Sequence, residues 1–130
     1  MYSAVTRNIR ITVEPRFLDD QSAPDEGRWF WAYEVEIANL GQEPVQLKTR
    51  HWRITDAVGR TQDVRGIGVV GEQPVIEPGA AFTYTSGCPL PTPSGIMAGS
   101  YRMEAPGGES FEVAIPAFSL DVPDAHRTVN

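Results

Sequence analysis

The sequence predicts an all-β domain, built as an antiparallel β-sandwich of about seven or eight strands. Apolar residues fall mostly at every second position, which is the period of a strand with one buried face. Turn residues recur at roughly 8–12-residue intervals, as they do between the short strands of a sandwich. No segment shows the helical period, and the 11 prolines and 12 glycines disfavour long helices. A closed β-barrel is the main alternative architecture.

The first half of the chain contains the clearest alternation. One strand is expected from Ala4 to Phe17, followed by a polar loop over 19–27. The alternation resumes from Trp29 to Ile37, and this strand is expected to be central in its sheet. A further strand spans Val45 to Ile54. Its apolar residues change from odd to even positions, which predicts a β-bulge near Thr49 to His51.

The second half is expected to form shorter strands, the first two of them from Thr61 to Arg65 and from Phe82 to Thr85. The segment from Gly87 to Gly95 contains prolines that cannot donate to a β-ladder, so we expect an ordered loop or a linker between the sheets there. The remaining strands are expected at Tyr101 to Met103 and at Phe111 to Leu120, the latter an edge strand with a bulge or bend at Pro116.

Length and charge limit the kind of protein this sequence can encode. The 130 residues are expected to form a single domain over 1–130, with an ordered core over about 4–122 and flexible termini. The net charge of −6 disfavours general nucleic-acid binding, which needs a basic surplus to displace counterions from phosphates. The sequence shows no secretory signal, no apolar run of membrane length and only one cysteine, Cys88. We therefore expect a cytoplasmic protein with neither a membrane nor a nucleic-acid partner.

The run Gly66-Ile67-Gly68-Val69-Val70-Gly71 matches G-x-G-x-x-G, which holds a dinucleotide pyrophosphate when it opens a helix. Two prolines follow within a few residues and exclude that helix, so no dinucleotide fold is expected. The turn is still a candidate anion nest, because successive backbone N–H groups can hold phosphate oxygens. The alternative is structural, with glycines for positive-φ turns and arginines on a solvated face. The candidate anion-binding or interaction loop consists of Gly66, Gly68, Gly71, Arg50 and Arg65.

Residues suited to catalysis or metal binding are few. Cys88 lacks an evident general base, because His51 and His126 are far apart in the sequence. No cysteines or histidines have the spacing of metal ligands. We interpret the acidic segment as a solvated loop, since it lacks the ordered alternation of a calcium loop. We expect no catalytic residues, no metal site and no cofactor. The acidic residues of that loop are Asp19, Asp20, Asp25 and Glu26.

Beyond the glycine run, the sequence contains several longer motifs, among them Arg50-His51-Trp52-x-Ile54-Thr55, Gly66-x-Gly68-Val69-Val70-Gly71-x-Gln73-Pro74 and Phe82-x-Tyr84-Thr85-Ser86-Gly87. Together these motifs resemble the ApaG family over nearly the whole chain. One departure is Ile67, which stands where we expect an acidic residue. The resemblance implies a fibronectin type III-like or immunoglobulin-like sandwich in a cytoplasmic protein associated with cobalt and magnesium resistance. It also implies protein binding, and it supplies no catalytic residues.

The sequence and the resemblance together favour a non-enzymatic protein-interaction module, whose protein partner the sequence does not identify. Loops on a rigid scaffold commonly carry binding. The alternative function is a weak phosphate or nucleotide (pyrophosphate) sensor that uses the glycine loop. We expect a monomer or a weak homo-oligomer, because Pro116 disfavours extension of the sheet at its edge. The candidate partner-binding residues are Phe30, Cys88, Pro89 and Pro91.

Overall fold

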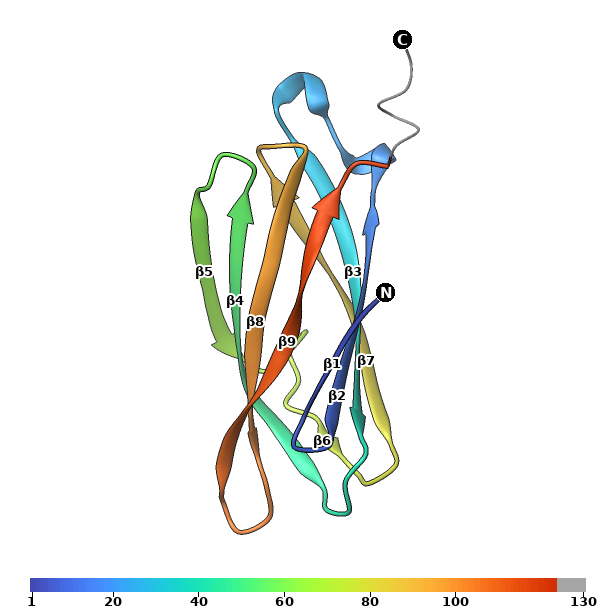
Figure 1. Ribbon diagram of the computed structural model, residues 1–130, viewed down its shortest axis with the longest axis vertical. Helices are drawn as coiled ribbons and strands as arrows, with labels where there is room; N and C mark the ends of the chain where they lie inside the picture. Colours follow the sequence, from blue (N-terminus) through green and yellow to red (C-terminus); the bar gives the residue numbers. More distant parts are fainter. Residues whose placement is uncertain (124–130) are drawn as a thin grey trace.

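Two antiparallel β-sheets stack face to face in the computed structural model, which describes residues 1–123 (Figure 1). The strand order is β1-β2-β3-β7 in the four-stranded sheet and β5-β4-β8-β9 in the five-stranded sheet, with β6 pairing to β4. The predicted sandwich is confirmed. The elements are β1 (Tyr2–Thr6), β2 (Ile9–Phe17), the single-turn 3-10 helices η1 (Asp19–Gln21) and η2 (Pro24–Glu26), β3 (Trp29–Asn39), β4 (Val45–Asp56), β5 (Thr61–Ile67), β6 (Val75–Ile76), β7 (Ala81–Leu90), β8 (Ser94–Glu104) and β9 (Ser110–Asp121).

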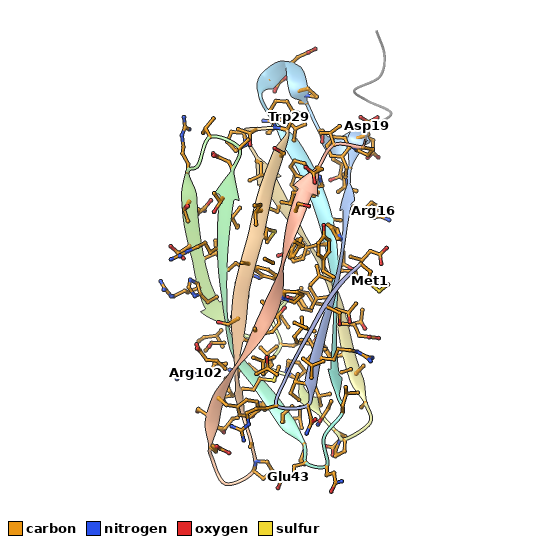
Figure 2. All side chains as sticks on the ribbon, viewed as in Figure 1. Met1, Arg16, Asp19, Trp29, Glu43 and Arg102 are labelled. Carbon is orange, nitrogen blue, oxygen red and sulfur yellow. The ribbon has the colours of Figure 1, made fainter. Side chains whose placement is uncertain are left out.

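The core lies between the two sheets, where the inward side chains of both meet (Figure 2). The alternation in the sequence buries Ile11 and Val35 from one sheet and Leu47, Tyr101 and Phe118 from the other. Strand β3 lies between β2 and β7, so its predicted central position is confirmed. Each sheet buries one face and turns the other outward, so alternate residues of most strands reach the surface, whereas the outward Ala32 and Ala38 of the central strand β3 are buried.

The single strand predicted from Ala4 to Phe17 is wrong, because this segment is the hairpin of β1 and β2. The chain turns at Arg7 and Asn8, whose φ angles of 48° and 65° give the left-handed geometry of a two-residue hairpin turn. The alternation predicts strand on both sides of the turn but does not reveal the turn itself. Strand structure also begins at Tyr2, earlier than the expected start of the core.

The ordered loop predicted from Gly87 to Gly95 is also wrong. Its first four residues belong to β7 and its last two to β8, which leaves only 91–93 as a turn. Pro89 is tolerated because β7 is an edge strand of its sheet, where half of the backbone N–H groups have no ladder partner.

Both predicted irregularities are present in the strand registers. The shift in β4 lies between Leu47 and Thr49, at the start of the range that the change of phase predicts. The shift between β8 and β9 lies beside Pro116, between Ile115 and Phe118 of the edge strand. Each bulge places one extra residue in a strand and thereby changes which side chains reach the core.

Strand β5 continues to Ile67, two residues beyond its predicted end, and the two-residue strand β6 follows the glycine run. No α-helix occurs in residues 1–123, and no helix there is long and apolar enough to span a membrane. The expected flexible C-terminal tail, with His126, lies outside the described residues from 124 onward.

Candidate functional site

The glycine run forms a tight turn at the end of strand β5, which we call the glycine turn (residues 66–72). Val69 and Glu72 exchange two backbone hydrogen bonds of 2.8 and 2.9 Å. Between them, Val70 and Gly71 have φ angles of 43° and 81°, the pattern of a type I′ turn. Gly68 has a φ of 66°, and a Cβ on it would lie 2.1 Å from the carbonyl oxygen of Glu72. The backbone path itself therefore requires glycine at 68.

Several N–H groups that an anion nest would need are bonded within the protein. The Gly68 N–H donates to the carbonyl oxygen of Lys48 at 2.9 Å, and the side-chain amide of Gln73 donates to the same oxygen at 2.9 Å. The Val69 and Glu72 N–H groups bond each other's carbonyls. A phosphate oxygen would have to displace the Gly68 bond to reach that amide.

Arg50 faces the glycine turn and donates hydrogen bonds to the backbone carbonyl oxygens of the turn. The guanidinium lies over Gly66, where an added Cβ would come within 2.7 Å of three of its atoms. Its Nη1 donates to the carbonyl oxygens of Gly68 at 2.8 Å and of Ile67 at 3.3 Å. Glycine at 66 thus makes room for an arginine that fixes the turn against β4.

Two tyrosine hydroxyls meet inside the core near this point. Tyr101 pairs in register with Arg50, and its hydroxyl hydrogen-bonds to that of Tyr84 from the opposite sheet. Burial raises the pKa of both Tyr84 and Tyr101, so both hydroxyls stay neutral. We interpret this pair as a structural link between β7 and β8.

A basic hollow of about 510 Å³ lies on the outer face of the five-stranded sheet, beside the glycine turn. The β4–β5 register sets Gly66 opposite Arg50 and Arg65 opposite His51, so the two predicted arginines face opposite ways. The Arg50 side chain lies on the inner side with its buried register partner Tyr101 and contacts the glycine turn, whereas Arg65 shares the outer face with His51. The structure therefore brings Arg50 to Gly66 and Gly68 but does not bring the Arg50 and Arg65 side chains together. Arg102 of β8 was not predicted, and it points away from the sheet (Figure 2). Within residues 1–123 neither Arg65 nor Arg102 has an ion pair. The lining residues are Thr49, Arg50, His51, Arg65, Gly66, Ser100, Arg102 and Glu112.

An ion-pair network extends from the hollow along β4 and β5. The Nε2 of His51 donates to Asp63 Oδ1 at 2.8 Å, and the Nε of Arg53 donates to the same oxygen at 3.3 Å. The hydrogen bond from His51, together with Arg53, lowers the pKa of Asp63. Asp63 thereby reduces the positive charge of the outer face beside His51 and Arg53, but not beside Arg102.

The variant Asp63→Asn should lose stability at neutral pH by a small amount that shrinks in acid. Because the pKa of Asp63 is lower in the folded state, the stabilisation is present above the unfolded value of about 3.9 and is lost as pH falls below it. Urea unfolding of both proteins at pH 7 and in the acid range measures the difference. An unchanged difference between the two pH ranges would contradict the ionised hydrogen bond.

Exposed apolar side chains gather on and next to the glycine turn. Ile67 is 73% exposed, Val70 55% and Val75 56%. Ile67 ends β5, Val70 is at the tip of the turn and Val75 begins β6, so all three come from one short stretch of chain. Such a surface is better suited to a protein than to an anion.

The predicted partner-binding residues divide between the surface and the core. Phe30 and Pro89 are direct cross-strand neighbours on the outer face of the four-stranded sheet. The Phe30 ring covers Gly87, where a Cβ would lie 2.7 Å from it, and Pro91 is exposed in the β7–β8 turn. Cys88 is only 2% exposed and packs in the core. Its assignment to a partner surface is therefore corrected, because the alternation of β7 turns it inward.

The thiol of Cys88 should react with an alkylating reagent only after unfolding. Burial raises the pKa of Cys88 to about 11, so the reactive thiolate is scarce at pH 8, and the sulfur is out of reach of solvent. Iodoacetamide labelling followed by mass spectrometry, with and without guanidinium, measures this. Stoichiometric labelling of the native protein within minutes would contradict a core position.

Residues 1–123 contain few side chains grouped in a way that suits metal binding. That part of the chain holds no cluster of three or more His, Cys, Asp and Glu side chains able to bind a metal ion. The acidic residues of the 19–27 loop lie on and beside η1 and η2, at the end of the sandwich near Trp29 (Figure 2). The candidate site consists of the glycine turn and the basic hollow beside it.

Comparison with known proteins places this geometry in one family. The family model described as ApaG domain matches residues 19–105, from η1 through β8. The protein ApaG of Methylorubrum populi is 63% identical over 130 residues and that of Xanthobacter autotrophicus 62%, with 100% of each chain covered. A crystal structure of the Bordetella pertussis protein named ApaA has a TM-score of 0.86 at 49% identity, covering 88% of this chain and 94% of that chain. The chain therefore belongs to the ApaG family.

Proposed function

We propose that the protein is a non-enzymatic, cytoplasmic protein-binding module that docks a partner through the glycine turn. The observation that carries this proposal is Val70. A β-branched residue in the left-handed region is strained, and a type I′ turn favours Asn or Gly at this position. The side chain is 55% exposed, so packing within the protein does not account for it. Strained residues cluster at functional sites, where the strain serves binding.

The neighbours of Val70 support the same function. Ile67 and Val75 extend the apolar surface on either side of the turn. The turn is fixed from within by Arg50 and by the bond from Gly68 to Lys48, so its side chains are presented in one arrangement. A preorganised surface loses less conformational freedom on binding.

Val70→Asn should stabilise the protein and weaken its association with a partner. Asn tolerates positive φ, so relief of strain should raise the free energy of unfolding by about 1 kcal/mol. The lost apolar side chain should weaken docking at the same time. Thermal and urea unfolding measure the first effect. A Tm equal to or below that of the natural protein would contradict the strain at Val70.

Site-specific photocrosslinking tests docking directly. A photoreactive residue at 70 or 75 in cells of the source organism should give a discrete crosslinked species. The same residue at Val58 is the matched control, because Val58 is 65% exposed and apolar but lies in the β4–β5 turn, away from the glycine turn. Identical crosslinks from all three positions, or none from 70, would contradict the proposal.

The basic hollow favours a second candidate function, weak binding of phosphate or a nucleotide pyrophosphate group. Arg65 and Arg102 flank His51 and Ser100, and arginines without ion pairs suit anionic oxygens. We expect pyrophosphate to shift the amide resonances of Ser100 and Arg102 and to lose this effect in Arg65→Ser. No shift at either residue at millimolar pyrophosphate would eliminate this candidate.

The association with cobalt and magnesium resistance is also a proposal for this chain. We attribute it to the docked partner, because the surface described here suits a protein. A deletion strain should grow poorly on cobalt, and the natural gene but not Val70→Asn should restore growth. Equal rescue by both genes would contradict a link through the glycine turn.

A further inference from the structure

We propose that the free edge of β7 accepts an extended, basic segment of a partner protein as an additional strand of the four-stranded sheet. We call this surface the β7 edge; its outward residues are Ala81, Thr83, Thr85, Gly87 and Pro89, all exposed. It lies on the other sheet from the basic hollow, and it does not depend on docking at Val70.

The β7 edge is the least protected edge of the sandwich. Natural proteins protect edge strands with charges, prolines, bulges or short length. Strand β1 has only five residues, and the Thr6 hydroxyl accepts the Ala114 N–H of β9 at 3.3 Å. Strand β9 is bent at Pro116, and β5 carries Asp63 and Arg65. Strand β7 has ten residues, none of them charged, and only a proline near its end.

Alternate backbone groups of β7 point toward the free edge. The Phe30 carbonyl accepts the Leu18 N–H on the β2 side, so odd residues of β3 bond toward β7. Each odd residue of β3 pairs with an even residue of β7, so the odd residues of β7 turn their N–H and C=O groups outward. Pro89 is odd, which explains why a residue without an N–H is accepted. Thr83 and Thr85 therefore present ladder groups with no strand beyond them in residues 1–123.

Carboxylates lie one strand behind the β7 edge. Glu36 pairs in register with Thr83, and Glu34 pairs with Thr85. Two shallow hollows of about 380 and 270 Å³ lie on this outer face, and Glu14 and Glu34 line both of them. The first hollow reaches β7 at Thr83 and the second at Thr85. Each hollow is also lined by one arginine, Arg10 in the first and Arg16 in the second, so carboxylates outnumber the arginines in both.

Two of the three glutamates behind the β7 edge, Glu14 and Glu34, have no ion-pair partner within residues 1–123. Glu14 and Glu34 are direct cross-strand neighbours, and like charges in that position destabilise a sheet. The third glutamate, Glu36, pairs with Arg10 at 3.8 Å. A strand added to β7 would lie roughly 9–10 Å from β3, within reach of lysine or arginine extending over the short threonines.

The unpaired carboxylates behind the β7 edge favour a basic segment as the added strand. Strand addition obtains its affinity from main-chain hydrogen bonds and its specificity from alternate side chains. A segment with Lys or Arg at alternate positions would supply both the ladder and the missing cations. A second copy of this chain would add another uncharged strand, leave Glu14 and Glu34 unpaired and bring together two chains of net charge −6.

The test uses the full chain and a fluorescent ten-residue peptide in which lysine alternates with valine and threonine. Anisotropy measures binding, and ¹⁵N amide shifts locate it. We expect saturable binding with shifts centred on Thr83, Thr85 and Gly87. A matched peptide with N-methyl groups on its ladder amides keeps the charge but loses the hydrogen bonds. It should bind at least about tenfold more weakly.

Variants separate the backbone from the charges. Thr85→Pro removes an outward N–H, and Thr85→Lys places a repelling charge on an exposed position that folding tolerates. Both variants should bind the peptide roughly tenfold more weakly. Glu34→Gln should reduce the affinity for the peptide by a smaller factor and should make that affinity less dependent on salt. Thr61→Lys places the same charge on an exposed threonine of β5 in the other sheet, so it is the matched control for Thr85→Lys and should bind the peptide like the natural protein.

Two results would overturn the proposal. The first is equal binding of the N-methylated and unmodified peptides, which would show a charge contact without an added strand. The second is concentration-dependent dimerisation in sedimentation that shifts the same β7 amides in the absence of peptide, which would make a second copy the occupant. Either result leaves docking at Val70 standing, because the crosslinking at 70 and 75 reports on the other surface.

Discussion

Replacing Trp52 with alanine is expected to lower the free energy of unfolding by about 3–5 kcal/mol. Trp52 is 3% exposed and lies between the sheets. Its ring meets those of Tyr33, Phe118 and Tyr101 at centroid distances of 5.3, 5.9 and 6.5 Å. These rings come from both sheets, so truncation leaves a cavity that neither sheet can fill by moving alone. Urea unfolding followed by circular dichroism measures the loss.

Two controls accompany this variant. Trp52→Phe keeps an aromatic ring in the cluster and should cost clearly less than Trp52→Ala. Trp29→Ala removes an indole that is only partly buried at the rim and should also cost less. A loss below about 1 kcal/mol for Trp52→Ala, the ordinary size for a point substitution, would contradict its central place in the core.

Gly99→Ala is expected to cost about 2–3 kcal/mol, because the new methyl group would collide with backbone. An added Cβ would lie 2.1 Å from the carbonyl oxygen of His51 and 3.2 Å from the Cα of Trp52. Those atoms belong to β4, which pairs with β8 in the interior of the five-stranded sheet. The two strands must separate to admit the methyl group, and the β4–β8 ladder weakens.

Gly41→Ala is the matched control for Gly99→Ala. It makes the same change to the unfolded chain, and its Cβ would meet side-chain atoms only, at 3.3 and 3.5 Å. Its free energy of unfolding should stay within about 1 kcal/mol of the natural protein. Thermal unfolding of both variants gives the comparison. Equal Tm values for the two variants would show that β4 and β8 are not as close as the structure has them.

Most of the strands could be predicted from the sequence, because alternation reports directly on a half-buried strand. The Arg7–Asn8 turn could not, because its positive φ angles occur in residues other than glycine and the alternation continues on both sides. The extent of β7 was hidden by Pro89, which excludes a central strand but not an edge strand. Whether a strand lies at the edge or in the centre of a sheet depends on its pairing with strands far away in the sequence. The local sequence does not reveal that pairing.

The candidate site shows the same limit. Arg50, Arg65 and Gly66 could be placed on consecutive antiparallel strands from the sequence, but the grouping of their side chains was wrong, because Arg50 faces inward with Tyr101 and Arg65 faces outward with His51. Arg102 could not, because its place in the hollow depends on the register of β8 and the bulge in β4. The inward position of Cys88 was available in principle. Once β7 is extended past Gly87, its two-residue period puts Cys88 on the buried face.

We propose that the glycine turn is a preorganised docking surface, and its Gly68 amide and Arg50 are bonded within the protein. Titration of ¹⁵N-labelled protein with pyrophosphate, followed through the amide resonances, tests it most directly. We predict that the Gly68 and Gly71 resonances stay in place at millimolar pyrophosphate, whatever happens at Ser100 and Arg102. Saturable shifts centred on the Gly68 and Gly71 amides at micromolar pyrophosphate would contradict the claim.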